Sequence, residues 1–559
     1  MFIYYFYWFF IIEFAFICCQ DLSPTVTLED GQVRGTVNRT VGLGKTYYAY
    51  RGIPFAKKPI DNLRFASPVK NDAWNGVLNA TYDKDECTQL NVFSNLSKES
   101  DVTGSEDCLY INVYTTKLNA TLPVMVWIYG GGFIGGSSAY RNGGPDYLLD
   151  EDIIFVSFNY RLGVFGFLST EDNAATGNWG LKDQLLALKW VQTNIKRFGG
   201  DSNKVTIFGE SAGAASVSYI VDSKLSKGLF AGAIMQSGTS LCLWALSRDA
   251  RKKAFDVGKK LNIKTTNSTK NLIDSLRKVD YRKLKVAENN VTLSYIPDIF
   301  SGLPFGVVQE PDHENAILSD RSYKLLSTGD FNRVPLIIGY NSLEIKGIPS
   351  DLSLPSLLLS QIILSVPKLA PYDLTGNLLL RFLAGKIIRV HYFGLDLVID
   401  PHSTQVSKFL SVDQFSRPIR KTVELMSKYT NVFYYKLSYE GKLGNPNRTS
   451  PGVGHAEDIN YLFYLGNITV SPEDALTRKR LVTLWTNFAK FGNPTPISTS
   501  DVLQNTTWIP NTKLNQTNVY YLNINKTLSN EINPDQADWN FYSQIIYGVF
   551  GNESYYTTY

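Results

Sequence analysis

Short apolar runs alternate with helical patterns along the middle of the chain, and this alternation constrains the fold more than any other feature. Six runs bounded by turn residues predict buried strands, at 123–129, 152–160, 204–208, 231–238, 333–340 and 431–439. Between two of them, apolar residues recur at helical spacing over 180–200 and the pattern stops at Gly199. The alternation predicts an α/β fold with a mostly parallel central sheet flanked by helices.

The length and composition leave the number of domains open. A chain of 559 residues with 44% hydrophobic residues fits several domains or one large α/β domain with insertions. The net charge of +4 is small for this size, so we expect no nucleic acid as a partner. We interpret residues 20–559 as a single domain.

The first nineteen residues are almost wholly apolar, with Glu13 as the one interruption. The run is short for a membrane span and resembles a secretory signal peptide over residues 1–19, with an uncleaved anchor as the alternative. We therefore expect a secreted, extracellular protein without a later span. Twelve glycosylation sequons agree with this, at Asn38, Asn79, Asn95, Asn119, Asn267, Asn290, Asn447, Asn467, Asn505, Asn515, Asn525 and Asn552.

Three cysteines remain after the leader. Cys87 and Cys108 are spaced so that a disulfide could close the short loop between them, which an oxidising compartment would favour. Cys242 is then the odd one, most simply a buried free thiol.

The stretch GESAG places Ser211 between a predicted strand and a helical segment rich in small residues. This is the context of a nucleophile elbow, in which Gly209 and Gly213 remove side chains that would clash where strand meets helix. A tight turn that merely contains serine is the alternative. The strand before it and the helix after it favour a nucleophile.

A serine nucleophile needs a base and an orienting carboxylate. Of the four histidines, His455 follows the last strong strand in a glycine-containing loop, whereas His313 and His402 are typical of loops and His391 of a packed position. Glu344 lies just past a predicted strand and between Ser211 and His455 in the chain, which is the order serine, acid, histidine.

A run of three glycines follows the strand at 123–129. Backbone N–H groups of Gly131 and Gly132, with that of Ala212 after the serine, are suited to an oxyanion hole. No Lys-Ser/Thr pair follows the run, so it does not indicate a phosphate-binding loop.

These residues stand within longer motifs that resemble the type-B carboxylesterases, the animal carboxylesterase and cholinesterase group. The matching motifs are YRGIPFAKKP, EDCLYINVY, VMVWIYGGGF, SFNYRLGVFGFLS, GNWGLKDQLLALKWVQTNIKRFGGD, VTIFGESAG, MQSG, GHAEDINYLF and WTNFAKFGNPTP. They extend over nearly the whole chain.

The resemblance implies an α/β-hydrolase fold and a serine carboxylesterase that needs neither metal nor cofactor and acts on a small-molecule ester. It implies Ser211, Glu344 and His455 as the catalytic triad, with Gly131, Gly132 and Ala212 as oxyanion donors. It also implies a Cys87–Cys108 disulfide and an ion pair between Arg51 and Glu106. Glu210 would stabilise the imidazolium, and Trp244 and Phe133 would wall the acyl pocket.

Differences between this sequence and the related esterases limit the range of expected substrates. The loop between Cys87 and Cys108 has no tryptophan, which in cholinesterases faces the choline cation. Glu210 stands where juvenile hormone esterases typically have glutamine. The alternatives to a general esterase are a lipase-like esterase and a non-catalytic adhesion or binding protein of the same family.

Overall fold

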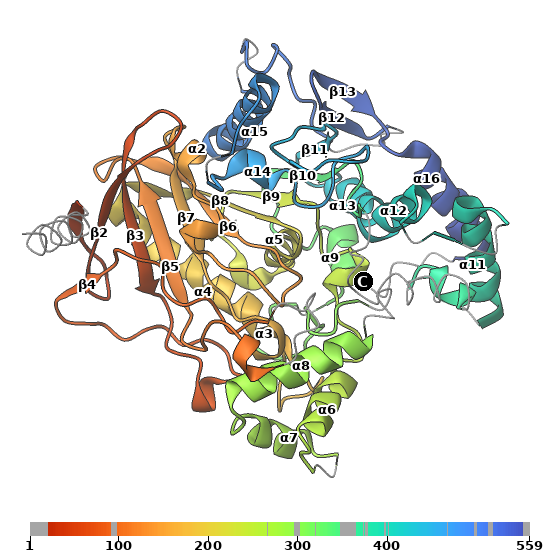
Figure 1. The fold of residues 1–559 in the computed structure, drawn as a ribbon, viewed down its shortest axis with the longest axis horizontal. Helices are drawn as coiled ribbons and strands as arrows, with labels where there is room; N and C mark the ends of the chain where they lie inside the picture. Colours follow the sequence, from red (N-terminus) through yellow and green to blue (C-terminus); the bar gives the residue numbers. More distant parts are fainter. Residues whose placement is uncertain are drawn as a thin grey trace, which may run out of the picture.

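One large twisted sheet forms the centre of the molecule in the computed structural model (Figure 1). The structure describes residues 21–551 except 91–97, 265–266, 296–301, 319, 347–364, 373, 375–377, 396–398, 401, 467, 497–499 and 513–517. The strand order is β1-β2-β3-β5-β7-β6-β8-β9-β10-β11-β12-β13, with β4 (Val77–Asn79) pairing β2. The expected signal peptide lies outside the described residues.

The middle of the sheet is parallel and its two edges are antiparallel. The run from β7 to β12 is parallel, namely β7 (Ile154–Phe158), β6 (Leu122–Ile128), β8 (Gly200–Glu210), β9 (Gly232–Gln236), β10 (Leu336–Asn341), β11 (Val432–Leu437) and β12 (Tyr520–Ile524). The six strands predicted from sequence are confirmed, and they are all the strands of this run except β12, at its end. The antiparallel edges are β1 (Leu22–Thr27), β2 (Gln32–Arg39), β3 (Thr46–Pro54) and β5 (Tyr110–Thr115) on one side and β13 (Leu528–Ile532) on the other.

Helices cover both faces of the parallel strands. Figure 1 shows α15 (Pro472–Phe491) on one side of β6 and β8, and α4 (Trp179–Asn194) and α5 (Ala212–Asp222) on the other. The predicted helix over 180–200 is α4 with a short 3₁₀ extension, and it ends at Gly199, which has φ +83°. The other α-helices of the described residues are α2 (Asp146–Leu149), α3 (Gly163–Phe167), α6 (Ala250–Lys260), α7 (Thr269–Leu276), α8 (Tyr281–Tyr295), α9 (Ser322–Thr328), α11 (Leu378–Phe393), α12 (Thr404–Ser411), α13 (Arg417–Met426), α14 (Ile459–Leu462), α16 (Gln536–Asn540) and α17 (Tyr547–Phe550).

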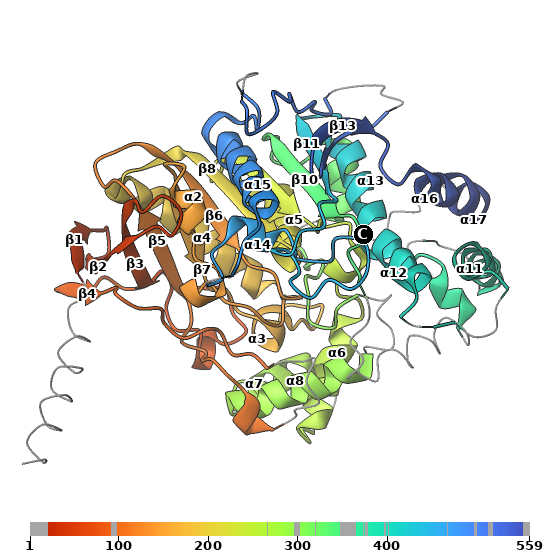
Figure 2. The same ribbon diagram turned by 45° about the horizontal axis from the view of Figure 1, so that its top comes forward.

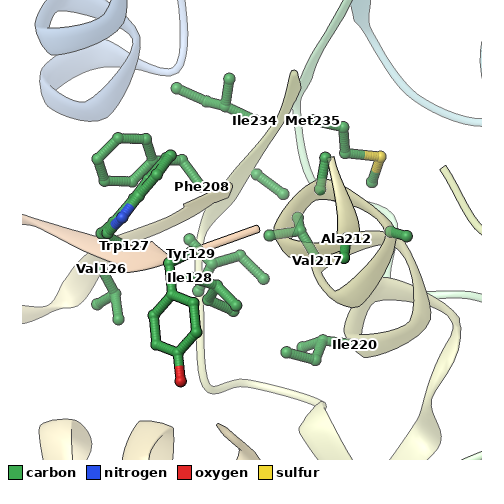
Figure 3. Close-up of a cluster of buried hydrophobic side chains, with 14 of the residues drawn as sticks. Val126, Trp127, Ile128, Tyr129, Phe208, Ala212, Val217, Ile220, Ile234 and Met235 are labelled. Atoms are coloured by element: carbon green, nitrogen blue, oxygen red, sulfur yellow. The ribbon is translucent and has the colours of Figure 1, made fainter. Parts of the chain in front are cut away.

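The main hydrophobic core lies between the sheet and its helices. Figure 3 shows the part of it between β6, β8, β9 and α5, where Phe208, Ile234 and Val217 are buried together. A smaller, separate cluster joins α11 and α12 to the C-terminal helices through residues such as Ile388 and Phe541. Figures 1 and 2 both place this second cluster at the end of the molecule opposite β1–β4.

The cysteine predictions are confirmed. Cys87 and Cys108 form a disulfide, and Cys242 is a buried free thiol. Burial raises the pKa of the Cys242 thiol to about 12, so the reactive thiolate is scarce at neutral pH.

The ion pair expected between Arg51 and Glu106 is wrong. Glu106 is held by Arg64, whose Nε donates to Oε1 over 2.7 Å, while Arg51 pairs with Asp83 at 3.4 Å. Arg64 rather than Arg51 pairs with Glu106 because the Arg64 guanidinium also donates to the backbone carbonyl oxygens of Leu276, Arg277 and Val279, which hold it beside Glu106.

The asparagines of the predicted glycosylation sites differ in exposure. The asparagines at positions 79, 119, 267, 447 and 505 are exposed, those at 38, 290 and 525 are half-buried, and those at 95, 467, 515 and 552 lie outside the described residues. Among the described residues, no helix is both long enough and apolar enough to cross a bilayer.

Candidate active site

Ser211 occupies a sharp turn between β8 and α5. Its backbone has φ +58° and ψ −125°, a conformation that a residue with a side chain rarely adopts. Neighbouring strands and the helix hold the turn, because Ser211 N donates to Gln236 O and Ser211 O accepts from Ala215 N, each over 2.9 Å. The strained turn projects the side chain away from the end of the strand, as a nucleophile elbow does.

The two glycines that flank this turn are sterically required. A Cβ on Gly213 would overlap the carbonyl oxygen of Ile128 on β6, and a Cβ on Gly209 would overlap the backbone of Gly213. The close approach of β8, α5 and β6 therefore leaves no room for a side chain at either position. The sequence prediction of a glycine-dependent turn is confirmed in this respect.

Glu344 and His455 reach Ser211 from two separate loops. Glu344 follows β10 and is buried, with Oε1 accepting from Asn341 N over 2.6 Å. His455 lies in the loop between β11 and α14, and its backbone N–H donates to Glu344 O over 2.9 Å. The two loops thus support each other at the carboxyl edge of the parallel strands, where sites form in such sheets.

The three side chains form a hydrogen-bonded series. His455 Nε2 lies 2.8 Å from Ser211 Oγ, and His455 Nδ1 lies 2.7 Å from Glu344 Oε2. This geometry allows the imidazole to accept the serine proton at Nε2 while the carboxylate accepts the Nδ1 proton.

A second carboxyl group faces the same imidazole. Glu210 Oε1 lies 3.2 Å from His455 Nε2, and the Glu210 side chain is buried. Burial raises the pKa of Glu210 above its ordinary value, with the neighbouring His455 opposing that rise. For His455, burial lowers the pKa, but the charges of Glu210 and Glu344 outweigh it and the pKa is raised. The site therefore stabilises an imidazolium.

The glycine run after β6 lies against the serine turn. A Cβ on Gly130 would come within 3.0 Å of Ser211 Cβ, and Gly131 and Gly132 have φ of +108° and +61°. These left-handed conformations suit glycine and bend the loop back over the turn. Ala212 is the first residue of α5, so its N–H belongs to the helix N-terminus beside Ser211.

Three buried polar residues that the sequence analysis did not single out support the two loops. Asn341 Nδ2 donates to Gly454 O over 2.8 Å and to Asp458 Oδ1 over 3.3 Å, which ties the Glu344 loop to the His455 loop. Gln236 Nε2 donates to Asp458 Oδ2 over 2.7 Å. The available signals were position alone: Asn341 ends a strand, and Asp458 follows His455 by three residues.

Aromatic side chains extend from the imidazole. The Phe415 ring centroid lies 4.9 Å from that of His455 and 5.6 Å from that of Trp244. Sequence reasoning missed Phe415, which lies in a short π-helix at Val412–Ser416. Phe133, also expected at the acyl pocket, is fully buried against Phe167. The assignment of Trp244 and Phe133 to that pocket stays a prediction.

The other three histidines lie apart from Ser211. His313 contacts Glu310 at 3.1 Å, His391 stacks on Phe541, and His402 lies in a turn before α12. Among the described residues, no group of three or more His, Cys, Asp or Glu side chains is arranged to hold a metal ion.

Comparisons with known proteins agree with this geometry. Residues 22–542 match the model of the carboxylesterase family. The chain is 36% identical to juvenile hormone esterase from Tribolium castaneum over 87% of this chain and 86% of the relative. It is 36% identical to a carboxylic ester hydrolase from Bombus ignitus over 94% of this chain and 95% of the relative.

A solved structure matches as well. Juvenile hormone esterase from Manduca sexta, crystallised with OTFP covalently attached, superimposes with a TM-score of 0.81 at 27% identity, covering 94% of this chain and 99% of that one. The chain therefore belongs to the carboxylesterase family, and it is a carboxylic ester hydrolase with the α/β-hydrolase fold.

Proposed function

We propose that the protein is a secreted serine carboxylesterase that uses Ser211, His455 and Glu344 as its catalytic triad. The observation that carries the proposal is the pair of contacts at His455, 2.8 Å to Ser211 Oγ and 2.7 Å to Glu344 Oε2. The apolar leader, the exposed sequons and the disulfide support secretion.

The reaction proceeds by two acyl transfers. His455 Nε2 takes the Ser211 proton as Oγ attacks the ester carbonyl, and the backbone N–H groups of Gly131, Gly132 and Ala212 hold the oxyanion of the tetrahedral intermediate. The imidazolium then gives the proton to the leaving alcohol, which departs and leaves an acyl-serine. Water, deprotonated by His455, then attacks that acyl group; the bond from the acyl carbon to Ser211 Oγ breaks, the imidazolium returns its proton to Oγ, and the acid is released.

The surroundings of His455 favour esters with an apolar acyl group. Phe415 and Trp244 form an aromatic row beside the imidazole. The disulfide loop has no tryptophan to face a choline cation, which argues against a choline ester as the preferred substrate. Glu210 stands where juvenile hormone esterases typically have glutamine, which argues against juvenile hormone. The complete triad favours an enzyme over the adhesion-protein alternative.

The first test is hydrolysis of p-nitrophenyl acetate and butyrate by the secreted protein and by Ser211→Ala. We expect turnover to fall by about 10³-fold or more in the variant, because the nucleophile is lost while the oxyanion donors remain. A fluorophosphonate probe should label wild-type protein on the peptide that contains Ser211, as read by mass spectrometry.

Ser237→Ala is the matched control. Ser237 follows the neighbouring strand β9 and also has a positive φ, of +56°, but its buried hydroxyl has no hydrogen-bond partner among the described residues. Folded wild-type protein that hydrolyses neither ester and takes no label, or Ser211→Ala that retains the activity of Ser237→Ala, would refute the proposal.

A further inference from the structure

The loop that carries the proposed oxyanion donors is unusually rich in glycine. We call residues 130–136 the glycine loop, and five of its seven residues are glycines. Glycine loses more conformational freedom on folding than any other residue, so such a segment keeps a single shape only where contacts hold it. N–H groups that are preorganised for an oxyanion therefore depend on what supports this loop.

Backbone bonds support the first part of the glycine loop. Gly131 O accepts from the N–H groups of Ile134 and Gly135 over 3.1 and 3.0 Å, which closes a tight turn. Phe133 O accepts from Gly163 N over 2.7 Å, which ties the middle of the loop to the start of α3. The turn is therefore fixed in itself, and its placement depends on how the rest of the loop is held.

The side chain of Gln89 holds the end of the glycine loop. Gly136 N donates to Gln89 Oε1 over 2.9 Å, and Gln89 Nε2 donates to Gly136 O over 3.1 Å. One amide thus pairs with both backbone polar groups of Gly136, as a neighbouring strand would. Because a side-chain amide has both a donor and an acceptor, this pairing fixes the orientation of the peptide groups as well as their position.

Gln89 is itself fixed by the loop that the disulfide closes. Its N–H donates to Thr103 O over 3.1 Å, and its carbonyl oxygen accepts from Thr103 N over 3.0 Å. Cys87, two residues earlier, is joined to Cys108, and Gln89 Nε2 also donates to Cys87 O over 3.2 Å. The Gln89 side chain therefore projects from a cross-linked and hydrogen-bonded segment, which makes it a rigid support.

We propose that Gln89 is a positioning residue for the oxyanion hole, through which the disulfide loop holds the N–H groups of Gly131 and Gly132 in place. The inference rests on the proposed function, in which these groups bind the oxyanion formed at Ser211. Gln89 acts through Gly136 and not on the ester itself. Its effect belongs to the transition state, because a displaced donor weakens binding of the developing negative charge more than it weakens binding of the neutral ester.

The test compares Gln89→Met with the wild type in hydrolysis of p-nitrophenyl butyrate. Methionine is similar in length but cannot pair with Gly136, so kcat should fall about tenfold or more with KM unchanged. Affinity for an alkyl trifluoromethyl ketone, whose carbonyl oxygen becomes an oxyanion when Ser211 Oγ adds to it, should fall by a similar factor. The acidic limb of the pH profile should stay in place, because the bonds of His455 to Ser211 and Glu344 are not altered.

Gln192→Met is the matched control. Gln192 is also half-buried, and its Nε2 donates to the backbone carbonyl oxygens of Ser202 and Leu229, each over 2.9 Å. Ser202 lies near the start of β8, whereas Ser211 follows the end of that strand. The control should keep both kcat and the affinity for the ketone.

Gln89→Asn separates the reach of the side chain from its polarity. Asparagine keeps an amide but is one carbon too short to pair with Gly136, so it should lose activity as Gln89→Met does, including where the apolar variant folds poorly. Wild-type kcat in either variant overturns the proposal, and so does a loss of kcat without a matching loss of ketone affinity. Active Ser211→Ala protein would instead refute the proposed function, whatever the Gln89 variants do.

Discussion

In most proteins charged groups are exposed and apolar side chains are buried. The region around Ser211 and the exposed side of helix α11 depart from this rule in opposite ways. Around Ser211, the carboxyl groups of Glu210, Glu344 and Asp458 are buried. On α11, leucine and valine side chains are exposed instead. Burying charge and exposing apolar surface both cost stability, so each departure marks a place where a chain is shaped by function as well as by folding.

The two regions differ in how firmly they are held. The carboxyl groups of Glu344 and Asp458 accept hydrogen bonds from Asn341 at the end of β10, and Asp458 also accepts one from Gln236 at the end of β9. Helix α11 belongs instead to a small separate cluster at the end of the molecule. The comparison predicts that disturbance of the first region abolishes chemistry, whereas disturbance of the second leaves the chemistry intact.

A pair of glycine substitutions gives the largest contrast. A Cβ on Gly213 would overlap the carbonyl oxygen of Ile128, and a Cβ on Gly385 of α11 would overlap that of Val366. Each alanine variant should lose about 1–3 kcal/mol of unfolding free energy through overpacking. Gly213→Ala should also lose at least about a hundredfold in kcat, because a small shift misplaces Ser211. Gly385→Ala should keep kcat.

Urea denaturation and p-nitrophenyl butyrate kinetics on both variants measure this contrast. Equal losses of kcat in the two variants would show that a disturbance at α11 reaches the catalytic residues, which contradicts the comparison.

Asn341→Ala should have the next largest effect. The variant keeps the backbone bond to Glu344 but removes the side-chain bonds to Gly454 and Asp458, so the His455 loop loses its tie to the acid. We expect kcat to fall about tenfold to a hundredfold with KM unchanged, as for a group that positions the reacting atoms.

Asn332→Ala is the control. Asn332 Nδ2 also donates to backbone carbonyl oxygens, those of Val221 and Ser223. These two residues lie at the end of α5 opposite Ser211. Its effect should be confined to stability. A KM change in Asn341→Ala without a kcat change would contradict a positioning role.

Glu210→Gln should produce the smallest effect, a shift of the pH profile. His455 must be unprotonated to accept the serine proton, and the Glu210 charge raises the pKa of His455. Removal of that charge lowers this pKa, so the acidic limb of kcat/KM should move to lower pH by about one unit. Initial rates across the pH range would measure the shift, and a limb that stays in place or moves upward would count against the electrostatic role.

The sequence by itself determined the class of fold, and it predicted the three residues of the proposed triad. Apolar runs separated by helical patterns specify parallel strands, and Ser211 between Gly209 and Gly213 specifies a turn that tolerates few other residues. These features are local: the period of the hydrophobic pattern and the steric needs of a tight turn act over a few neighbouring residues.

Only the tertiary structure decided which distant groups meet. It placed Arg64 rather than Arg51 on Glu106, brought Phe415 to His455, and joined two loops through Asn341. It also turned an apolar helix outward at α11. Such pairings depend on the register and packing of elements far apart in the chain, where many partners of equal chemistry compete and only geometry selects among them.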